Sequence, residues 1–335
     1  MGVKSTSQAN FESQSSSFSN NFAAEDGGDY RGEGISATGG TKATPGDGYT
    51  YHLFTSPGLF VITNAGEAGS NDINYLLVGG GGGGGYDRGG GGGAGGFVNG
   101  DIAAAAGTYP IILGPGGAGG NNSTTKGSNG GESAWGSYPT LPWPGTIGGG
   151  GGGGSPQPAP TNQTGSVGGD YASGGGSWYN NNGSPAGPKP VPGIGSNSAG
   201  NAGMAPRGNG GAGGGAGGSD GFSHPNSDCN PGKTLPWIPT AYGFAQTNED
   251  GSGGGGYFAG GGGGGGNTIS PSNATRGSGG AGYGMGDPSP NGTSLKNGMT
   301  NSGAGGGGGA GDGPATKRTG GTGGPGVFLC RYPIG

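Results

Sequence analysis

Large and polar side chains alternate in two neighbouring segments near residue 50. Segment 48–55 (Gly-Tyr-Thr-Tyr-His-Leu-Phe-Thr) repeats bulky residues at every second position, the period of a half-buried strand. Ser56-Pro57-Gly58 follows and is typical of a turn. Leu59-Phe-Val-Ile-Thr63 then resumes strand composition, so the pattern predicts a β-hairpin.

Three more apolar segments, taken from both ends of the chain, also predict strands. Segment 73–78 is a nearly continuous apolar run and suits a buried strand. Segment 108–113 has strand composition, but Pro110 predicts an edge position because proline donates no ladder hydrogen bond. Segment 326–332 is the last strand expected. We predict a small antiparallel β-sandwich formed by residues 45–113 and 326–335, closed by the C-terminal strand.

Residues 114–325, together with 79–96, consist largely of glycine runs separated by loops. Glycine supplies 102 of the 335 residues and only 27% of residues are apolar, so any hydrophobic core must be small and local. No Gly-X-Y period persists over long distances, which excludes a collagen triple helix. Several runs, such as 79–85, contain seven uninterrupted glycines.

Such runs can become ordered if they pack as polyproline-II-type helices. This helix has three residues per turn and directs its N–H and C=O groups outward. Without Cβ atoms, glycine helices can approach closely enough to form lateral hydrogen bonds and Cα–H···O contacts. Because each hydrogen bond contributes only about 1 kcal/mol net, many helices must pack together. The expected fold is therefore mostly β and irregular: a small antiparallel β-sandwich plus a packed lattice of polyglycine-II helices, with long loops and almost no α-helix.

The loops between the runs carry every tryptophan of the chain. Loops on a rigid scaffold are where binding residues concentrate, and Trp and Tyr are favoured anchors of binding hot spots. Alternatively, these side chains pack over the lattice edges and shield them from water. The candidate receptor-contact residues are Trp135, Tyr138, Trp143, Trp178, Tyr179, Trp237, Tyr242 and Tyr257.

Residues 1–44 form a separate polar unit rich in Ser, Gln and Asn. The separations of seven and four between Phe11, Phe18 and Phe22 would place them on one helical face. The same side chains could anchor an extended arm in grooves of a neighbour, or the segment could be a solvated leader. We interpret residues 1–44 as a docking arm with these three phenylalanines as its candidate docking residues.

Charge and hydropathy exclude two classes of partner, nucleic acid and membrane. Thirteen basic and eighteen acidic residues give a net charge of −5, and no Lys/Arg stripe exists, so we expect no nucleic-acid binding. No stretch of about 20 apolar residues could span a bilayer. The N-terminus lacks the apolar region of a secretory signal. A protein that acts outside the cell would need another exit, such as release by lysis.

Motifs of catalysis and cofactor binding are weak or incomplete. GxGxxG recurs by chance in a chain this rich in glycine, and no amphipathic helix follows Val78 into Gly79 as a dinucleotide site requires. Gly232-Lys233-Thr234 matches the end of a phosphate-binding loop, but Ser227 stands where the first glycine is required. We therefore expect no cofactor.

Few side chains could serve as nucleophiles, bases or metal ligands. His52 is expected to be a packed or rim residue of its strand and His224 to lie exposed in a loop, which leaves no histidine-based metal site or catalytic triad. Nothing among the scattered carboxylates indicates a glycosidase pair. Cys229 and Cys330 are expected to be unpaired thiols, with a single disulfide between them as the alternative. We predict a protein that is not an enzyme.

The order of strands and glycine runs resembles the glycine-rich domain of phage and viral structural proteins. Tyr51–Thr63 and Ile73–Gly79 resemble its opening, and Gly107–Gly120 and Gly130–Gly136 resemble its second and third blocks. Gly323–Tyr332 resembles its final strand. The resemblance covers residues 45–335, but not the inserts 155–207 and 221–250.

This resemblance implies a virion-associated fibre or adhesin, a sheet module with packed polyglycine-II helices whose loops contact the host surface. We expect a phage tail fibre, tail tip or capsid-attached appendage, located in the virion and extracellular after lysis. Its expected partners are other virion proteins, bound through the N-terminal arm, and a host glycan or protein; it is expected to be a homo-oligomer. The alternative is a cellular glycine-rich matrix or ice-binding protein.

Overall fold

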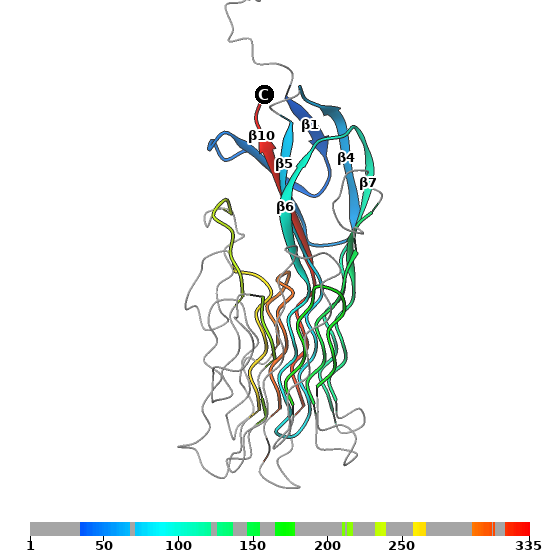
Figure 1. Ribbon diagram of the computed structural model, residues 1–335, viewed down its shortest axis with the longest axis vertical. Coiled ribbons are helices and arrows are strands. Elements are labelled where there is room, and N and C mark those ends of the chain that lie inside the picture. The colour runs from blue at the N-terminus through cyan, green and yellow to red at the C-terminus, as the bar shows by residue number, and fades with distance from the viewer. Residues whose placement is uncertain are drawn as a thin grey trace, which may run out of the picture.

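Two β-sheets occupy one end of the molecule, and glycine runs extend from them toward the other end (Figure 1). The computed structural model describes residues 34–67, 71–121, 126–136, 146–154, 165–177, 210–211, 213–216, 232–238, 257–265, 297–309, 311 and 319–335. No helix occurs in these segments. The mostly β and irregular fold class is therefore confirmed.

Both sheets have five strands, and every pair of neighbouring strands is antiparallel. Sheet A has the order β1 (Ile35–Thr38), β4 (Gly58–Ala65), β7 (Gly107–Ile112), β8 (Ser133–Trp135), β9 (Thr146–Ile147). Sheet B has the order β2 (Thr41–Ala43), β3 (Tyr49–Phe54), β10 (Val327–Pro333), β5 (Asp72–Val78), β6 (Phe97–Ala103). The C-terminal strand β10 thus lies at the centre of sheet B.

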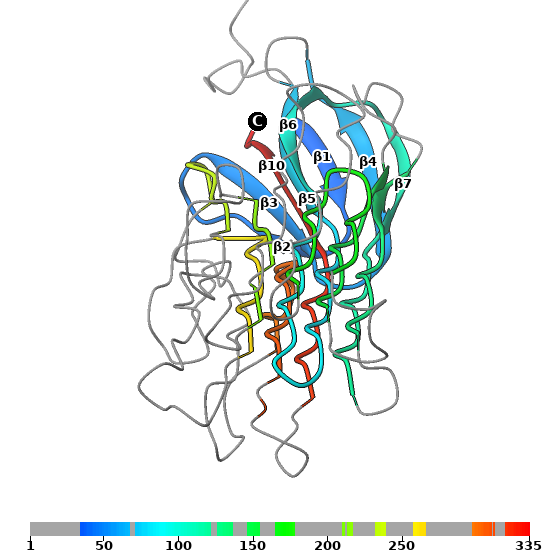
Figure 2. The ribbon, with the colours of Figure 1, turned by 60° about the horizontal axis from the view of Figure 1, so that its bottom comes forward.

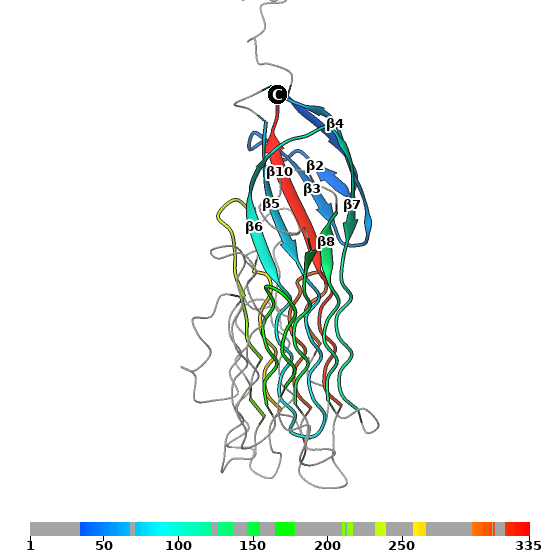
Figure 3. The ribbon, with the colours of Figure 1, turned by 45° about the vertical axis from the view of Figure 1, so that its right-hand side comes forward.

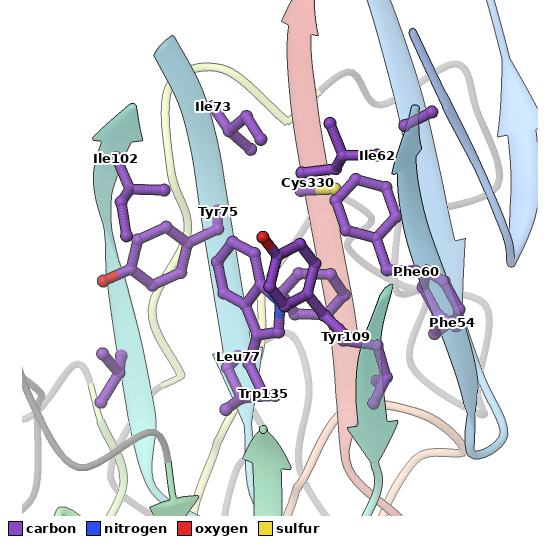
Figure 4. Packing of buried hydrophobic residues seen from close by; sticks show 14 of the residues in the cluster. Phe54, Phe60, Ile62, Ile73, Tyr75, Leu77, Ile102, Tyr109, Trp135 and Cys330 are labelled. Carbon is purple, nitrogen blue, oxygen red and sulfur yellow. The ribbon is translucent and has the colours of Figure 1, made fainter. Parts of the chain in front are cut away.

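Alternating side chains from the two sheets form the main core between them. Phe60 and Ile62 of sheet A face Tyr75 and Phe328 of sheet B, and all four are almost fully buried. Trp135 lies among them, with its ring centroid 4.9 Å from that of Phe328 (Figure 4). Aromatic rings therefore fill most of the space between the sheets, which supplies a compact core despite the low apolar content.

The five predicted strands are present as β3, β4, β5, β7 and β10, but the predicted boundaries need correction. Residues 35–38 and 41–43 were assigned to the docking arm, yet they form β1 and β2. Short strands β8 and β9 lie inside the segment predicted as glycine-rich lattice. All are short, so their composition carried little period-2 signal.

Pro110 does not lie at a sheet edge, contrary to the sequence prediction. Its strand β7 pairs with β4 on one side and β8 on the other. Strand β8 pairs with Ile111 and Ile112 only, and the Gly136 N–H then donates to the Pro110 carbonyl at 2.9 Å. The missing proline N–H therefore falls where β8 has already ended, so no ladder bond is lost.

A second apolar cluster covers the outer face of sheet B. Tyr51, Leu76 and Leu329 on that face are buried beneath Leu235 and Phe258 from later segments. Because β5 is buried on both faces, its apolar run is nearly continuous, as predicted.

The glycine runs are joined by backbone hydrogen bonds with a three-residue period. In run 79–85, the N–H groups of Gly79, Gly82 and Gly85 all donate to run 90–96. The N–H groups of Gly81 and Gly84 donate to run 321–324, and those of Gly80 and Gly83 donate to run 128–131. We interpret the pattern as packed polyproline-II-type helices, since that helix repeats every three residues.

Run 79–85 also accepts hydrogen bonds from three other runs. Donors in runs 117–120, 150–153 and 306–309 reach its carbonyl oxygens at 2.8 Å. Together with the three runs it donates to, it is surrounded on all sides. Figure 3 shows the runs side by side, continuing away from β5, β6 and β10.

Many glycine positions inside the lattice leave no room for a side chain. A Cβ atom on Gly84 would lie 2.0 Å from the Gly307 carbonyl oxygen, and one on Gly82 would lie 2.3 Å from that of Gly151. On the perimeter, side chains recur at every third residue and are exposed or half-buried: Pro115, Ala118 and Asn121 on one run, and Thr319, Thr322 and Pro325 on the next.

Both ends of the described chain lie at the same end of the molecule, which we call the sheet pole. A Cβ atom on Gly34 would lie 2.5 Å from the Gly335 Cα atom. The opposite end, the lattice tip, contains the turn 86–88 that joins runs 79–85 and 89–96 (Figure 2). Sequence reasoning did not indicate that the chain enters and leaves the body at one pole.

Candidate functional site

The predicted aromatic contact residues do not form one site. Trp135, predicted in an exposed loop, lies in β8 and is completely buried between the sheets, so that prediction is wrong. Trp237 and Tyr257 are half-buried beside sheet B. The remaining candidates lie outside the described residues: Tyr138, Trp143, Trp178, Tyr179, Tyr242, Phe11, Phe18 and Phe22.

Described residues next to some of these candidates lie at the lattice tip. Gly154 and Gly165 lie there, as do Ser177 and Gly210. Trp135 of β8 and Ile238 instead lie at the sheets. Trp178 and Tyr179 therefore directly follow, in sequence, a run that ends at the tip.

A polar row crosses four strands on the outer face of sheet B. Arg331 on β10 is the directly paired residue of both Tyr51 on β3 and Asn74 on β5. Its Nε donates to Asn74 Oδ1 at 2.8 Å, and one Nη donates to the Tyr51 hydroxyl at 3.3 Å. Asn74 in turn donates to Asp101, its paired residue on β6.

The other end of this row is also anionic. The Tyr51 hydroxyl donates to Asp47 Oδ2 at 2.7 Å. Burial raises the pKa of Tyr51, and the Arg331 hydrogen bond acts in the opposite direction. One cation therefore lies between two carboxylates, each one hydrogen-bonded side chain away. We name Asp47, Tyr51, Arg331, Asn74 and Asp101 the Arg331 row.

Two aromatic rings hold the Arg331 guanidinium. Its Cζ lies 3.9 Å from the Tyr49 ring centroid and 5.3 Å from that of Trp237, both within cation–π range. Trp237 belongs to segment 232–238, where Lys233 exchanges two backbone hydrogen bonds with Phe258 at 2.8 and 2.9 Å. Arg331 thus ties a chain segment from the glycine-rich region to the sheet.

Sequence reasoning missed this arrangement. It selected Trp237 as a contact residue but not Arg331, Tyr49 or Asp47. The available signal was one arginine inside the otherwise apolar strand β10. Its partners come from β3 and β5, so their meeting depends on a strand order that periodicity does not specify.

His52 is completely buried in the core, where it forms a second polar cluster with the Gly39 carbonyl and the Tyr332 hydroxyl. Its Nδ1 lies 2.7 Å from the Gly39 carbonyl oxygen, which can only accept, so Nδ1 carries the proton. Nε2 then accepts from the Tyr332 hydroxyl at 3.0 Å. Burial lowers the pKa of His52, so the neutral ring is favoured. The packed strand position predicted for His52 is confirmed; His224 lies outside the described residues.

Nucleophilic groups near His52 are suppressed by burial. Cys330 is completely buried, forms no disulfide, and has a thiol pKa well above its usual range because the charged form is desolvated. Burial likewise raises the pKa of Tyr332 to about 12. A thiol without thiolate character is a poor nucleophile, so burial disfavours nucleophilic attack by Cys330. Cys229 lies outside the described residues.

In the described segments, no group of three or more His, Cys, Asp or Glu side chains is placed to hold a metal ion. Nor does that part of the chain contain a helix long and apolar enough to cross a membrane.

Comparison with known proteins identifies the architecture. The model of a protein family described as a glycine-rich domain matches residues 55–333. No curated protein matches the chain. The matched range includes strands from both sheets and all of the described glycine runs, from the β3–β4 turn to the last residue of β10. The chain therefore belongs to the glycine-rich domain family.

Proposed function

We propose that this protein is a non-catalytic phage virion component, a tail fibre, tail tip or capsid-attached appendage that binds the host surface. The observation that carries the proposal is the separation of its ends. Both described chain ends lie at the sheet pole, and the hydrogen-bonded runs extend from there to the tip, where the flanks of segments 155–164 and 178–209 lie. This arrangement supports attachment at the sheet pole and binding through the segments that adjoin the tip.

The lattice suits a spacer because its order does not depend on a large apolar core. Run 79–85 is hydrogen-bonded to six neighbouring segments: 90–96, 117–120, 128–131, 150–153, 306–309 and 321–324. Each bond contributes about 1 kcal/mol net, so their number offsets the backbone entropy that glycine loses on ordering. Few side chains are needed, and loops can vary at the ends without disturbing the interior.

Attachment to the particle is assigned to the N-terminal arm, which joins the body at Gly34. Its partners are other virion proteins, and several copies assemble in the particle. Host recognition is assigned to the loops, with a surface glycan or protein as ligand. The protein is located in the virion and becomes extracellular on lysis. The resemblance of residues 45–335 to phage structural proteins supports this placement.

Immunoelectron microscopy of purified phage particles tests the proposal. An antibody against residues 155–207 should label fibres or tail tips, at a distance from the particle body. An antibody against the last residues of β10 should label nearer to the attachment point, since Gly335 lies at the sheet pole. Finding the protein only in a cellular or matrix fraction would contradict the proposal.

One observation favours the second candidate, an ice-binding or matrix protein. Thr319 and Thr322 are exposed three residues apart, beside Ala118 and Asn121 on the adjacent run. Regular exposed rows with this period suit an ordered ligand such as ice. A thermal-hysteresis assay decides between the two, since a phage adhesin should give none.

A further inference from the structure

The outer face of sheet A carries an apolar patch that the described chain leaves open. Leu59 on β4 is 55% exposed and Ile112 on β7 is 51% exposed. The two strands are hydrogen-bonded neighbours, with Leu59 directly opposite Pro110, and Ile112 two residues further along β7 on the same face. Pro110, opposite Leu59, and Val61, next along β4 on the same face, are half-buried. We name Leu59, Val61, Pro110 and Ile112 the sheet A patch.

The two outer faces of the sandwich differ in this respect. The corresponding face of sheet B is covered by Leu235, Ile238 and Phe258. Large apolar side chains gathered on an open face mark an interaction surface more often than scattered ones do. Sheet A thus has an exposed apolar surface, whereas the equivalent surface of sheet B is covered.

A hollow of about 190 Å³ adjoins the patch at Leu59. It lies between the β3–β4 turn, residues 55–58, and Gly40–Thr41, and Leu53 and Phe54 also line it. Its size suits one or two side chains of a docking segment rather than a folded domain.

The described neighbours of the patch on β1, β4 and β7 are polar but uncharged. Ser36 and Thr38 on β1, Thr63 on β4 and Thr108 on β7 are its exposed neighbours. A partner that matches it should therefore be largely uncharged and carry spaced apolar side chains. Residues 5–22 have this composition, with Phe11, Phe18 and Phe22 and a single charge at Glu12.

Chain length allows this segment to reach the patch. The arm joins the body at Gly34, just before β1, which pairs with β4. Phe22 precedes Gly34 by twelve residues, which span up to about 40 Å when extended. Strand β4 from Ala65 to Leu59 covers roughly 20 Å. The phenylalanines therefore lie within reach of the patch, either on the same copy or on an adjacent one.

We propose that residues 11–22 of this chain dock on the sheet A patch through Phe11, Phe18 and Phe22. This inference rests on the proposed role of residues 1–44 as a docking arm, and it places the three phenylalanines on the body of this chain or of an adjacent copy rather than on another virion protein. It is tested in purified protein, so it and the virion proposal can fail separately. The three rings would cover Leu59 and Ile112, and the Ser and Asn residues between them would lie along the exposed threonines.

A binding assay with full-length protein tests the docking. The full-length protein used as receptor in this assay carries Phe11→Ser, Phe18→Ser and Phe22→Ser. These substitutions prevent its own arm from occupying the sheet A patch. A fluorescent peptide of residues 8–26 should bind it saturably in fluorescence anisotropy. Adding Leu59→Ser and Ile112→Ser should weaken binding at least tenfold, and both sites are exposed, so the fold should be retained. Val167→Ser, at a residue 47% exposed elsewhere, is the matched control and should leave binding unchanged.

Photo-crosslinking distinguishes the two sources of the arm. A photoreactive phenylalanine analogue at position 18 in the full chain should crosslink to residues 59–61 and 108–112. Mixing isotope-labelled and unlabelled protein shows whether the arm comes from the same copy or a second one; either result supports docking on the patch. Absence of peptide binding, equal binding to the Leu59→Ser/Ile112→Ser receptor, or crosslinks confined to other surfaces would overturn the proposal.

Discussion

Whether a lattice position must be glycine depends on which atoms a Cβ atom would contact there. At Gly84 that atom would approach a backbone oxygen of run 303–309, which cannot rotate away as a side chain can. At Thr322, on the perimeter, the side chain faces solvent. Close approach thus requires glycine at positions such as Gly84, although Ala94 and Ala304 are buried elsewhere in the runs, while the perimeter has room for a side chain at every third position.

The substitution Gly84→Ala tests this requirement. Its Cβ would lie 2.0 Å from the Gly307 oxygen, so neighbouring runs must separate. We expect a loss of about 1–3 kcal/mol in the free energy of unfolding, the usual range for overpacking. Thr322→Ala in the same lattice should stay within about 0.5 kcal/mol of wild type. Thermal and denaturant unfolding of the three proteins provides the comparison; equal stability of both variants would refute close packing at Gly84.

His52 predicts how stability depends on pH. Its folded-state pKa is lowered below the usual 6.5 by burial, so the unfolded chain binds the proton more readily. The contribution to stability is fully present above pH 6.5 and is lost as pH falls from there toward the folded pKa. Between pH 8 and 5, wild type should therefore lose more thermal stability than His52→Gln does. A matching pH profile in the variant would show that His52 does not cause the dependence.

At the scale of elements, the sequence predicted strands well where they are long and alternate. Segments 48–55, 59–63 and 73–78 coincide closely with β3, β4 and β5. Strand β8 was missed because three residues carry no readable period, and its Trp135 was consequently assigned to an exposed loop. An aromatic side chain between glycine runs has the same local sequence whether it faces solvent or the core.

The Arg331 row depends on pairing that local sequence does not encode. Tyr51, Arg331 and Asn74 come from segments up to 280 residues apart, and only the order β3-β10-β5 brings them into one row. Among the described aromatic candidates, only Trp237 joins this cluster, and there its ring packs on a guanidinium of the same chain. For Trp237, packing against the body is therefore the observed role.

Removing the guanidinium should release segment 232–238. In Arg331→Ala, Trp237 loses its cation–π partner and the hydrogen bonds to Asn74 and Tyr51 disappear. Amide hydrogen exchange at Lys233 and Phe258 should accelerate at least tenfold, while exchange in run 79–85 should not change. Arg331→Lys keeps the charge without the planar fork and should give an intermediate rate. Unchanged exchange in Arg331→Ala would show that other contacts hold the segment.

For the whole molecule, composition predicted a packed glycine body but not its arrangement. The glycine runs have similar sequences. Their local sequence therefore does not indicate that run 79–85 lies at the centre of the lattice and run 114–121 on its perimeter. The three-residue spacing of Pro115, Ala118 and Asn121 was the available signal for an outer run. Interior runs lack such spacing because every direction around them is occupied by another backbone.

Hydrogen–deuterium exchange of residues 79–96 tests the central claim that glycine runs form one hydrogen-bonded lattice. A free glycine segment is a flexible coil, whose amides exchange at the rate of an unfolded peptide. The lattice predicts protection in runs 79–85 and 89–96 comparable to that of the central strand β10, and weaker protection in perimeter run 114–121. Exchange of residues 79–96 at the unfolded rate, with β10 still protected, would contradict the account and leave only the β-sandwich as ordered structure.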